Sequence, residues 1–185
     1  MIDFRSYSLP IFLFTAQFVF AFLFGFHSEY KYTPITSLSD YENPPRGILE
    51  FYYPFFTDVH VMMFVGFGFL MTFLRKYSFS SVGFNFILCA FTLEWTVLCQ
   101  GYIFDWSSAT KTFFVDAYSL IGADFTSAAV LISMGAVLGK VNGFQLLIMA
   151  FLEVPLQVVN KYICSKLFCA SDAGESMYVH TFGKY

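Results

Sequence analysis

The segment from Asp172 to Gly183 holds the residues of this 185-residue chain whose types and spacing most clearly predict chemistry. Asp172 followed three residues later by Glu175 is a capping-box pattern, so a helix is expected to begin here. His180 then lies about 12 Å along that helix, at a rise of about 1.5 Å per residue. In a hydrocarbon layer about 30 Å thick, this is close to the midplane. An ionisable side chain at that depth is costly unless it lines a pathway, so we predict that His180 is a pore residue.

Composition predicts a membrane protein. Hydrophobic residues make up 57% of the chain and charged residues 12%, and 27 residues are Phe. Soluble domains carry about 25% charged residues, and they could not cover so much apolar surface. The net charge of -3 and the lack of a basic run argue against a nucleic-acid partner. The predicted fold class is therefore all-α, a polytopic helix bundle in a lipid bilayer.

Five predominantly apolar runs predict five membrane-spanning helices within one membrane domain, residues 1–185. The runs are 9–26, 57–74, 79–104, 114–139 and 144–168, and a sixth begins at residue 173. The sixth has about ten residues after its cap, near 15 Å, which is too short to cross the hydrocarbon layer. We therefore expect that the chain is truncated and that these residues do not conduct by themselves.

The distribution of basic residues predicts the orientation. With a cytoplasmic N-terminus, Arg5, Lys140 and the turn Arg75–Ser78 lie inside, as the positive-inside rule favours. The loop from His27 to Phe56, which shows no helical pattern, then lies outside. Five basic residues would also lie outside: Lys31, Arg46, Lys111, Lys161 and Lys166.

Six ionisable residues fall within or near the predicted spans and are candidates for function. They are Asp58, His60, Glu94, Asp124, Glu153 and His180. Asp58 and His60 are expected near a helix start, where an acid favours the positive end of the dipole. Glu94 lies deep in the third span, so it must be protonated, paired or solvated. The sequence does not decide which of the six faces a pore.

Enzyme chemistry finds little support in the sequence. The three His residues are far apart, and no HExxH, GxSxG or P-loop motif is present. We therefore expect no catalytic residue, no metal and no cofactor. A disulfide between Cys164 and Cys169 is less favoured than free thiols. The leading classes are a channel or transporter, and a membrane scaffold or assembly subunit.

Four blocks of sequence carry a resemblance to a known family. They are Tyr53–Leu74, Ser80–Phe86, Gly135–Val141 and Asp172–Gly183, and they occur in family order. The chain resembles the N-terminal part of the Rh glycoproteins, the animal branch of the ammonium transporter family.

The resemblance implies a plasma-membrane trimer with one hydrophobic conduit through each subunit. Ammonium is recruited at an outer vestibule, loses its proton and crosses as neutral ammonia; whether carbon dioxide also crosses stays open. Phe125 matches a gate phenylalanine, His180 matches the first of two pore histidines, and Asp172 matches the acid that braces the outer mouth. A neutral imidazole offers one donor and one acceptor, which suits a small amine.

Two residues depart from the family pattern. Lys161 stands where the resemblance implies a vestibule acid, and a cation there is expected to repel ammonium. Glu94 replaces an expected Gln before Trp95. The alternative function is a non-conducting isoform or fragment that acts as an assembly or regulatory subunit of full-length Rh proteins, in homo- or hetero-oligomers.

The predicted orientation can be tested by labelling single cysteines on intact cells, after the four native cysteines are replaced. A cysteine in the loop 27–56 should react with an impermeant thiol reagent, because that loop is expected outside. A cysteine at the Arg75–Lys76 turn should not. Labelling at the turn alone would reverse the topology.

Overall fold

Helices make up nearly all of the regular structure in the computed structural model, which describes residues 4–45, 47–73 and 78–184. Short π-helical turns (η1, η3, η4) and one 3₁₀ turn (η2) extend or follow the α-helices. In chain order the elements are α1 (Phe4–His27), β1 (Ser28–Tyr30), α2 (Leu38–Glu42), α3 (Leu49–Val61), η1 (Met62–Gly66), α4 (Phe67–Leu70), η2 (Met71–Phe73), α5 (Ser78–Phe104), β2 (Phe113–Val115), α6 (Ala117–Val137), α7 (Gly143–Tyr162), η3 (Ile163–Leu167), η4 (Ser176–Thr181) and α8 (Phe182–Lys184).

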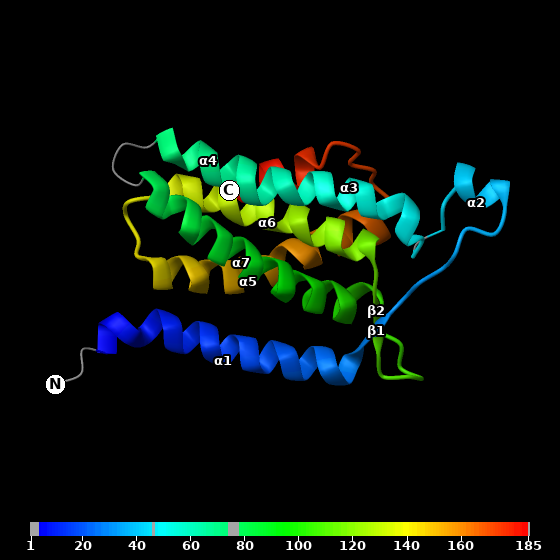
Figure 1. The fold of residues 1–185 in the computed structure, drawn as a ribbon, viewed down its shortest axis with the longest axis horizontal. Helices are drawn as coiled ribbons and strands as arrows, with labels where there is room; N and C mark the ends of the chain where they lie inside the picture. Colours follow the sequence, from blue (N-terminus) through cyan, green and yellow to red (C-terminus); the bar gives the residue numbers. More distant parts are fainter. Residues whose placement is uncertain (1–3, 46, 74–77, 185) are drawn as a thin grey trace.

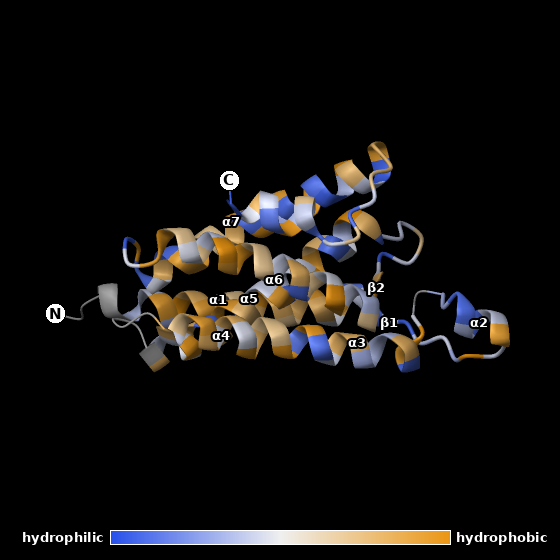
Figure 2. Ribbon diagram, turned by 90° about the horizontal axis from the view of Figure 1, so that it is seen from above, coloured by the Kyte–Doolittle hydropathy of each residue, from blue (hydrophilic) through white to orange (hydrophobic). Residues whose placement is uncertain are grey.

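Within the part of the chain that the structure describes, five helical segments are long and apolar enough to cross a membrane. They are Tyr7–His27, Leu49–Phe73, Phe79–Phe104, Ala117–Val137 and Gly143–Leu167. Hydrophobic residues cover most of their length, and hydrophilic ones gather toward the ends and in α2 (Figure 2). The expected fold class, an all-α membrane helix bundle, is confirmed.

The helices α5 and α6 form the centre of the bundle, while α1 lies at its edge (Figure 1). In the most apolar window of α6, 56% of the residues are buried, compared with 6% in α1. Aromatic stacking joins α1 to the rest, because the Trp95 ring stacks on Phe20 and Phe151, with ring centroids 5.4 and 4.9 Å away. The indole N–H of Trp95 also donates to the carbonyl of Phe151 at 3.0 Å.

Capping boxes set the starts of α6 and α7. The Asp116 carboxylate accepts the backbone N–H of Ser119, and the Ser119 hydroxyl lies 3.0 Å from the Asp116 nitrogen. Asn142 and Gln145 make the same reciprocal pair at the start of α7. Each pair satisfies two backbone donors that a helix start otherwise leaves free.

A two-stranded parallel sheet, which the sequence did not predict, closes one end of the bundle. Ser28 of β1 pairs with Phe113 of β2, and Tyr30 with Val115. Because residues 113–115 belong to β2, α6 begins at Ala117, whereas the fourth span was expected to begin at residue 114. The pairing also places the α1 end beside the α6 start (Figure 1).

The second long helix begins at Leu49, eight residues before the predicted start, so the loop that precedes it is shorter than expected. Pro54 lies early in α3, where its missing N–H removes one helical hydrogen bond and does not end the helix. Asp58 and His60 consequently lie well inside the helix, and their predicted place near a helix start is wrong. In the predicted turn Arg75–Ser78, residues 75–77 lie outside the described residues.

Gly183 allows α8 to approach the backbone of α6 closely. A Cβ atom at this position would lie 2.6 Å from the carbonyl oxygen of Ala129, a distance that requires a backbone shift. Gly135, on the exposed side of α6, has open space where its Cβ would be. The absence of a side chain at residue 183 is therefore a condition for docking the C-terminal segment.

Replacing Gly183 by Ala should weaken this docking by about 1–3 kcal/mol, the usual cost of overpacking. Hydrogen–deuterium exchange of peptides covering residues 176–184 should become faster. The matched variant Gly135→Ala should leave that exchange unchanged. Equal exchange in both variants would show that the contact does not hold the segment.

Candidate functional site

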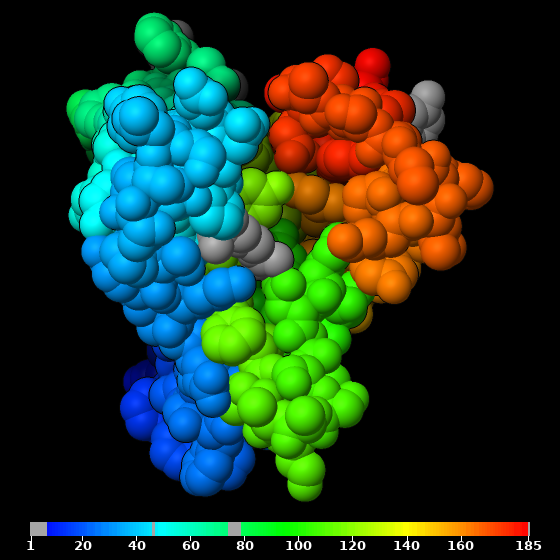
Figure 3. Space-filling model, turned by 90° about the vertical axis from the view of Figure 1, so that its right-hand side faces the viewer, coloured from blue at the N-terminus to red at the C-terminus, as the bar shows by residue number. Residues whose placement is uncertain are grey.

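A cavity of about 630 Å³ opens at the end of the bundle that carries the β1–β2 pair. Viewed from that end, the surface is hollowed between the α2–α3 region and the segment that follows α7 (Figure 3). The wall mixes aromatic, polar and charged side chains from α3, α5, α6, α7 and the segment after α7: Tyr52, Phe55, Gln100, Phe104, Asp105, Tyr118, Ser119, Ile121, Gly122, Phe125, Lys161, Ser165, Lys166 and Glu175. Two lysines and two carboxylates give the wall no formal net charge.

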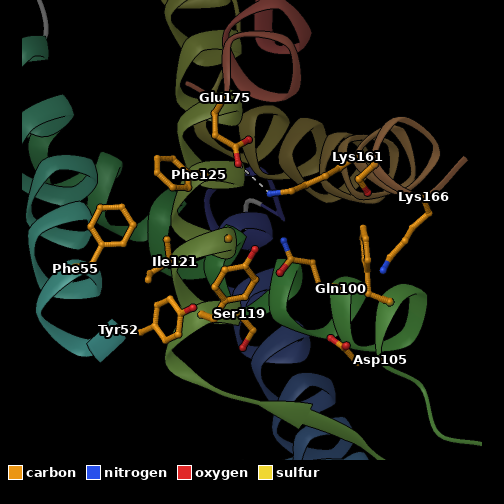
Figure 4. Close-up of a pocket in the computed structure, with 14 residues that line it drawn as sticks. Tyr52, Phe55, Gln100, Asp105, Ser119, Ile121, Phe125, Lys161, Lys166 and Glu175 are labelled. Atoms are coloured by element: carbon orange, nitrogen blue, oxygen red, sulfur yellow. Dashed lines mark hydrogen bonds and ion pairs between the residues drawn. The ribbon is translucent and has the colours of Figure 1, made fainter. Parts of the chain in front are cut away.

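Phe125 lies where this cavity meets the apolar interior. The α6 residues that line the cavity run from Tyr118 to Phe125 (Figure 4). Phe125 also packs against an apolar cluster whose further α6 members, Ala128, Ala129 and Ile132, lie toward the other end of the helix. Val59 and Met63 join this cluster from α3 and η1, and Val179 joins from η4. An open cavity whose wall includes charged and polar groups therefore gives way to apolar packing at one aromatic ring.

Asp172 organises the start of η4. Its carboxylate accepts the backbone N–H groups of Ser176, Met177 and Tyr178 at 3.0, 2.7 and 3.0 Å. Burial by itself would raise the pKa of Asp172, but these hydrogen bonds and the nearby Lys161 charge together hold the pKa below its ordinary value. The negative charge thus stays at the positive end of the helical turn.

The predicted capping box at Asp172 is wrong in its details. The Asp172 carbonyl accepts the N–H of Glu175 at 3.1 Å, so residues 172–175 form a turn and η4 begins at Ser176. Glu175 adopts left-handed backbone angles (φ 51°) and does not cap reciprocally. His180 therefore lies about 6 Å beyond the helix start, half the expected distance.

The structure does not bring His180 and Phe125 to the same cavity. The His180 side chain is exposed, and it is not among the described residues that line the cavity. Its neighbour Val179 is buried in the same apolar cluster as Phe125. His180 thus lies beside the apolar region, and its predicted role as a pore residue stays a prediction.

Lys161 does not stand as an isolated cation in the cavity wall. Its Nζ lies 3.2 Å from Oε1 of Glu175, as the dashed line in Figure 4 marks. It also lies 5.8 Å from the centre of the Tyr178 ring. The expectation that Lys161 repels ammonium neglected this partner, because Glu175 was interpreted as a helix cap.

Three further polar contacts join neighbouring helices. Nδ1 of His60 lies 3.1 and 3.2 Å from the two carboxylate oxygens of Asp124, which is fully buried. The side-chain amide of Gln17 donates to Glu94 at 2.5 Å, which supplies the partner that Glu94 was expected to need. The Ser133 hydroxyl lies 2.6 Å from the Glu153 carboxylate. The sequence marked His60, Asp124, Glu94 and Glu153 as ionisable groups, but it held no signal for their partners.

Gln157 links α7 to α6 and to η4. Its side-chain oxygen accepts from the Thr126 hydroxyl at 3.0 Å, and its amide donates to the Tyr178 carbonyl at 3.2 Å. Glu153, Gln157 and Lys161 follow each other at four-residue spacing, so they share one face of α7. This face contacts α6 and the segment from Glu175 onward.

All four cysteines are free thiols.

Comparison with known proteins identifies the family. The sequence profile of the Ammonium Transporter Family matches residues 44–185. The chain belongs to the ammonium transporter family. Within this family it is similar to the ammonium transporter Rh type B of Takifugu rubripes, with 48% identity over 183 residues that cover 96% of this chain and 39% of that protein.

Two other relatives agree with this placement in the Rh branch. The Rh type B protein of Danio rerio is 48% identical over 180 residues, covering 96% of this chain and 39% of the relative. The Rh type C protein of Oncorhynchus mykiss is 46% identical over 188 residues, covering 96% and 37%. The chain thus spans about two fifths of the length of the curated relatives it matches, and the predicted family is confirmed. In this member of the ammonium transporter family, a multi-pass membrane protein, Asp172 anchors the segment that carries His180.

Replacing Asp172 by Asn should destabilise the protein at pH 7 by about 1 kcal/mol or less, because the carboxylate is partly exposed. A pKa lowered by folding contributes stability above the ordinary value of about 4, and this stability is lost as the pH falls through the folded pKa. The difference in thermal unfolding between the two proteins should therefore shrink toward pH 3.

The exposed acid Glu42 on α2 provides the control, and Glu42→Gln should show no such dependence on pH. A constant difference between the Asp172→Asn variant and the parent protein from pH 7 to pH 3 would contradict the role assigned to the Asp172 charge.

Proposed function

We propose that the protein contributes a conduit for ammonia, entered by ammonium from the cavity. The observation that carries the proposal is the position of Phe125, at the boundary between an open cavity with charged and polar groups in its wall and an apolar cluster. This arrangement suits a substrate that arrives as a cation and proceeds as a neutral molecule. The Rh type B and type C relatives are named ammonium transporters, which supports the choice of substrate.

The physical reason for deprotonation lies in the cost of burial. An ion that leaves water for an apolar region loses a hydration energy that the apolar cluster around Phe125 does not replace. Neutral ammonia loses a few hydrogen bonds, so its barrier is far lower. Gln100, Ser119 and the tyrosines of the wall offer hydrogen-bonding groups on the cavity side, where ammonium sheds its proton to water.

His180 is the proposed partner of ammonia beyond the gate. A neutral imidazole both donates and accepts one hydrogen bond, and ammonia can satisfy both. Asp172 holds the backbone turn that positions this histidine. We further propose a plasma-membrane location, a cytoplasmic N-terminus and assembly with copies of itself or with other Rh proteins. The exposed apolar side chains of α1, such as Phe14 and Phe18, offer surface for lipid or for a neighbouring subunit.

Replacing Phe125 by Ala should let ions enter the apolar region, because the ring that forces dehydration is gone. In vesicles prepared from cells that express the Phe125→Ala variant, a sudden rise in ammonium concentration should then produce an ammonium-dependent current. Vesicles with the parent protein should show no such current. Phe79→Ala changes an exposed ring at the other end of the bundle and should produce no current. No current in either variant would remove Phe125 from the gate.

Replacing His180 by Ala should slow ammonia-driven internal alkalinisation roughly five- to ten-fold, because a hydrogen-bonding partner is lost. Lys184→Ala, at an exposed residue one turn later, should leave the rate unchanged. Unchanged rates in both variants would exclude His180 from the path. Vesicles in which the parent protein gives no alkalinisation above background, while it co-purifies with a full-length Rh protein, would instead support the assembly or regulatory role.

A further inference from the structure

Glu175 is held in an unfavourable backbone conformation at the edge of the cavity. Its φ of 51° is left-handed, which costs a residue other than glycine about 1–2 kcal/mol. The turn from Asp172 fixes this conformation, and the Glu175 carbonyl accepts the N–H of Val179 at 2.9 Å. A glutamate in a backbone conformation that glycine adopts more easily is a candidate for a functional role.

Only one of the two carboxylate oxygens of Glu175 has a polar partner among the described residues. Oε1 lies 3.2 Å from the Lys161 ammonium, whereas Oε2 is buried and has no hydrogen-bond partner among the described residues. The two side chains are 19% and 21% exposed, so their charges are partly shielded from water. A carboxylate in this state has capacity for a further N–H donor.

Lys161 has an alternative place when it leaves this pair. Its Nζ already lies 5.8 Å from the Tyr178 ring centre, within reach of a cation–π contact, and the cavity offers water. The lysine ammonium and a free ammonium ion are donors of the same kind, a compact charge with N–H groups. The two can therefore exchange at one carboxylate, the displaced lysine ammonium being solvated by cavity water and facing the Tyr178 ring.

We propose that Glu175 is the cation-binding residue of the outer cavity and that Lys161 is its built-in competitor. An ammonium ion binds the carboxylate of Glu175 by displacing the Lys161 ammonium. Because Lys161 is tethered, its effective concentration at Glu175 is high, and the site fills only at high external ammonium. The inference rests on the proposed function for its ligand, and it adds a threshold to the uptake of that ligand.

Binding can be measured without transport. The protein in lipid nanodiscs is titrated with ammonium chloride against tetramethylammonium chloride at constant ionic strength, and carboxylate bands are followed by infrared difference spectroscopy. Tetramethylammonium has the same charge but no N–H donor. We expect a saturable change in a carboxylate band that is absent in Glu175→Gln. Glu175→Gly should lack it too, and this variant relieves the backbone strain, so it keeps the fold.

The role of the competitor is tested by Lys161→Gln. This variant should lower the half-saturating ammonium concentration roughly five-fold, the factor that corresponds to loss of an ion pair of about 1 kcal/mol. Lys166→Gln, which changes the other lysine of the wall, should leave it unchanged. An equal shift in both lysine variants would indicate a general charge effect and would overturn the competition.

The outcomes separate this inference from the proposed function. A carboxylate band that saturates with ammonium in the parent protein but persists in Glu175→Gln overturns the inference, even if vesicles transport ammonia. A Glu175-dependent band without any flux supports the binding site and counts against conduction. Loss of thermal stability in Lys161→Gln and Glu175→Gln, with no ammonium-dependent band in the parent protein, would show that the pair only fastens the turn to α7.

Discussion

Polar groups inside a membrane-spanning bundle must find their partners within the protein, and this constraint determines how the helices are joined. Hydrocarbon cannot hydrogen-bond to a carboxylate or an amide, so each such group fixes the position of a neighbouring helix. His60 and Asp124 join α3 to α6 in this way, and Gln17 joins α1 to Glu94 of α5. Apolar packing in lipid is far less selective, because lipid chains fill an apolar surface equally well. The polar pairs therefore define which helix faces which.

The same constraint explains the change in character along α6. Near its start, the helix borders a cavity open to water, and it carries Tyr118, Ser119 and Gly122 there. Beyond Phe125 the cavity ends, and small or apolar residues predominate. The hydroxyl groups there bond within the protein, Ser127 to the carbonyl of Ala123 in its own helix and Ser133 to Glu153 and to the Gly183 carbonyl. Lys161 stands where the resemblance implies an acid, and its ammonium group is paired with Glu175. The cavity thus keeps a carboxylate while its net charge stays balanced.

The sequence predicted what depends on local pattern and missed what depends on placement. Runs of apolar residues predicted the long helices, and four blocks identified the family. The acid at Asp172 was correctly linked to a helix start, but a turn through Glu175 changed which N–H groups it binds. The β1–β2 pair and the early start of α3 were missed, because three-residue strands lack a period and the residues before 57 were interpreted as part of a loop without a helical pattern. The partner of His60 is 64 residues away, and no local pattern encodes such a distance.

The polar face of α7 has a consequence for the order of assembly. The short connection between α6 and α7 lets these two helices meet through contacts close in sequence, which form early. The segment from Glu175 to Gly183 binds residues that only this hairpin brings together: Lys161 and Gln157 on α7, and Ser133 on α6. The surface to which this segment binds does not form until α6 and α7 have both inserted into the membrane side by side. The histidine-bearing turn is therefore the last of these elements to find its place during synthesis, and any error in the register of the hairpin is transmitted to it.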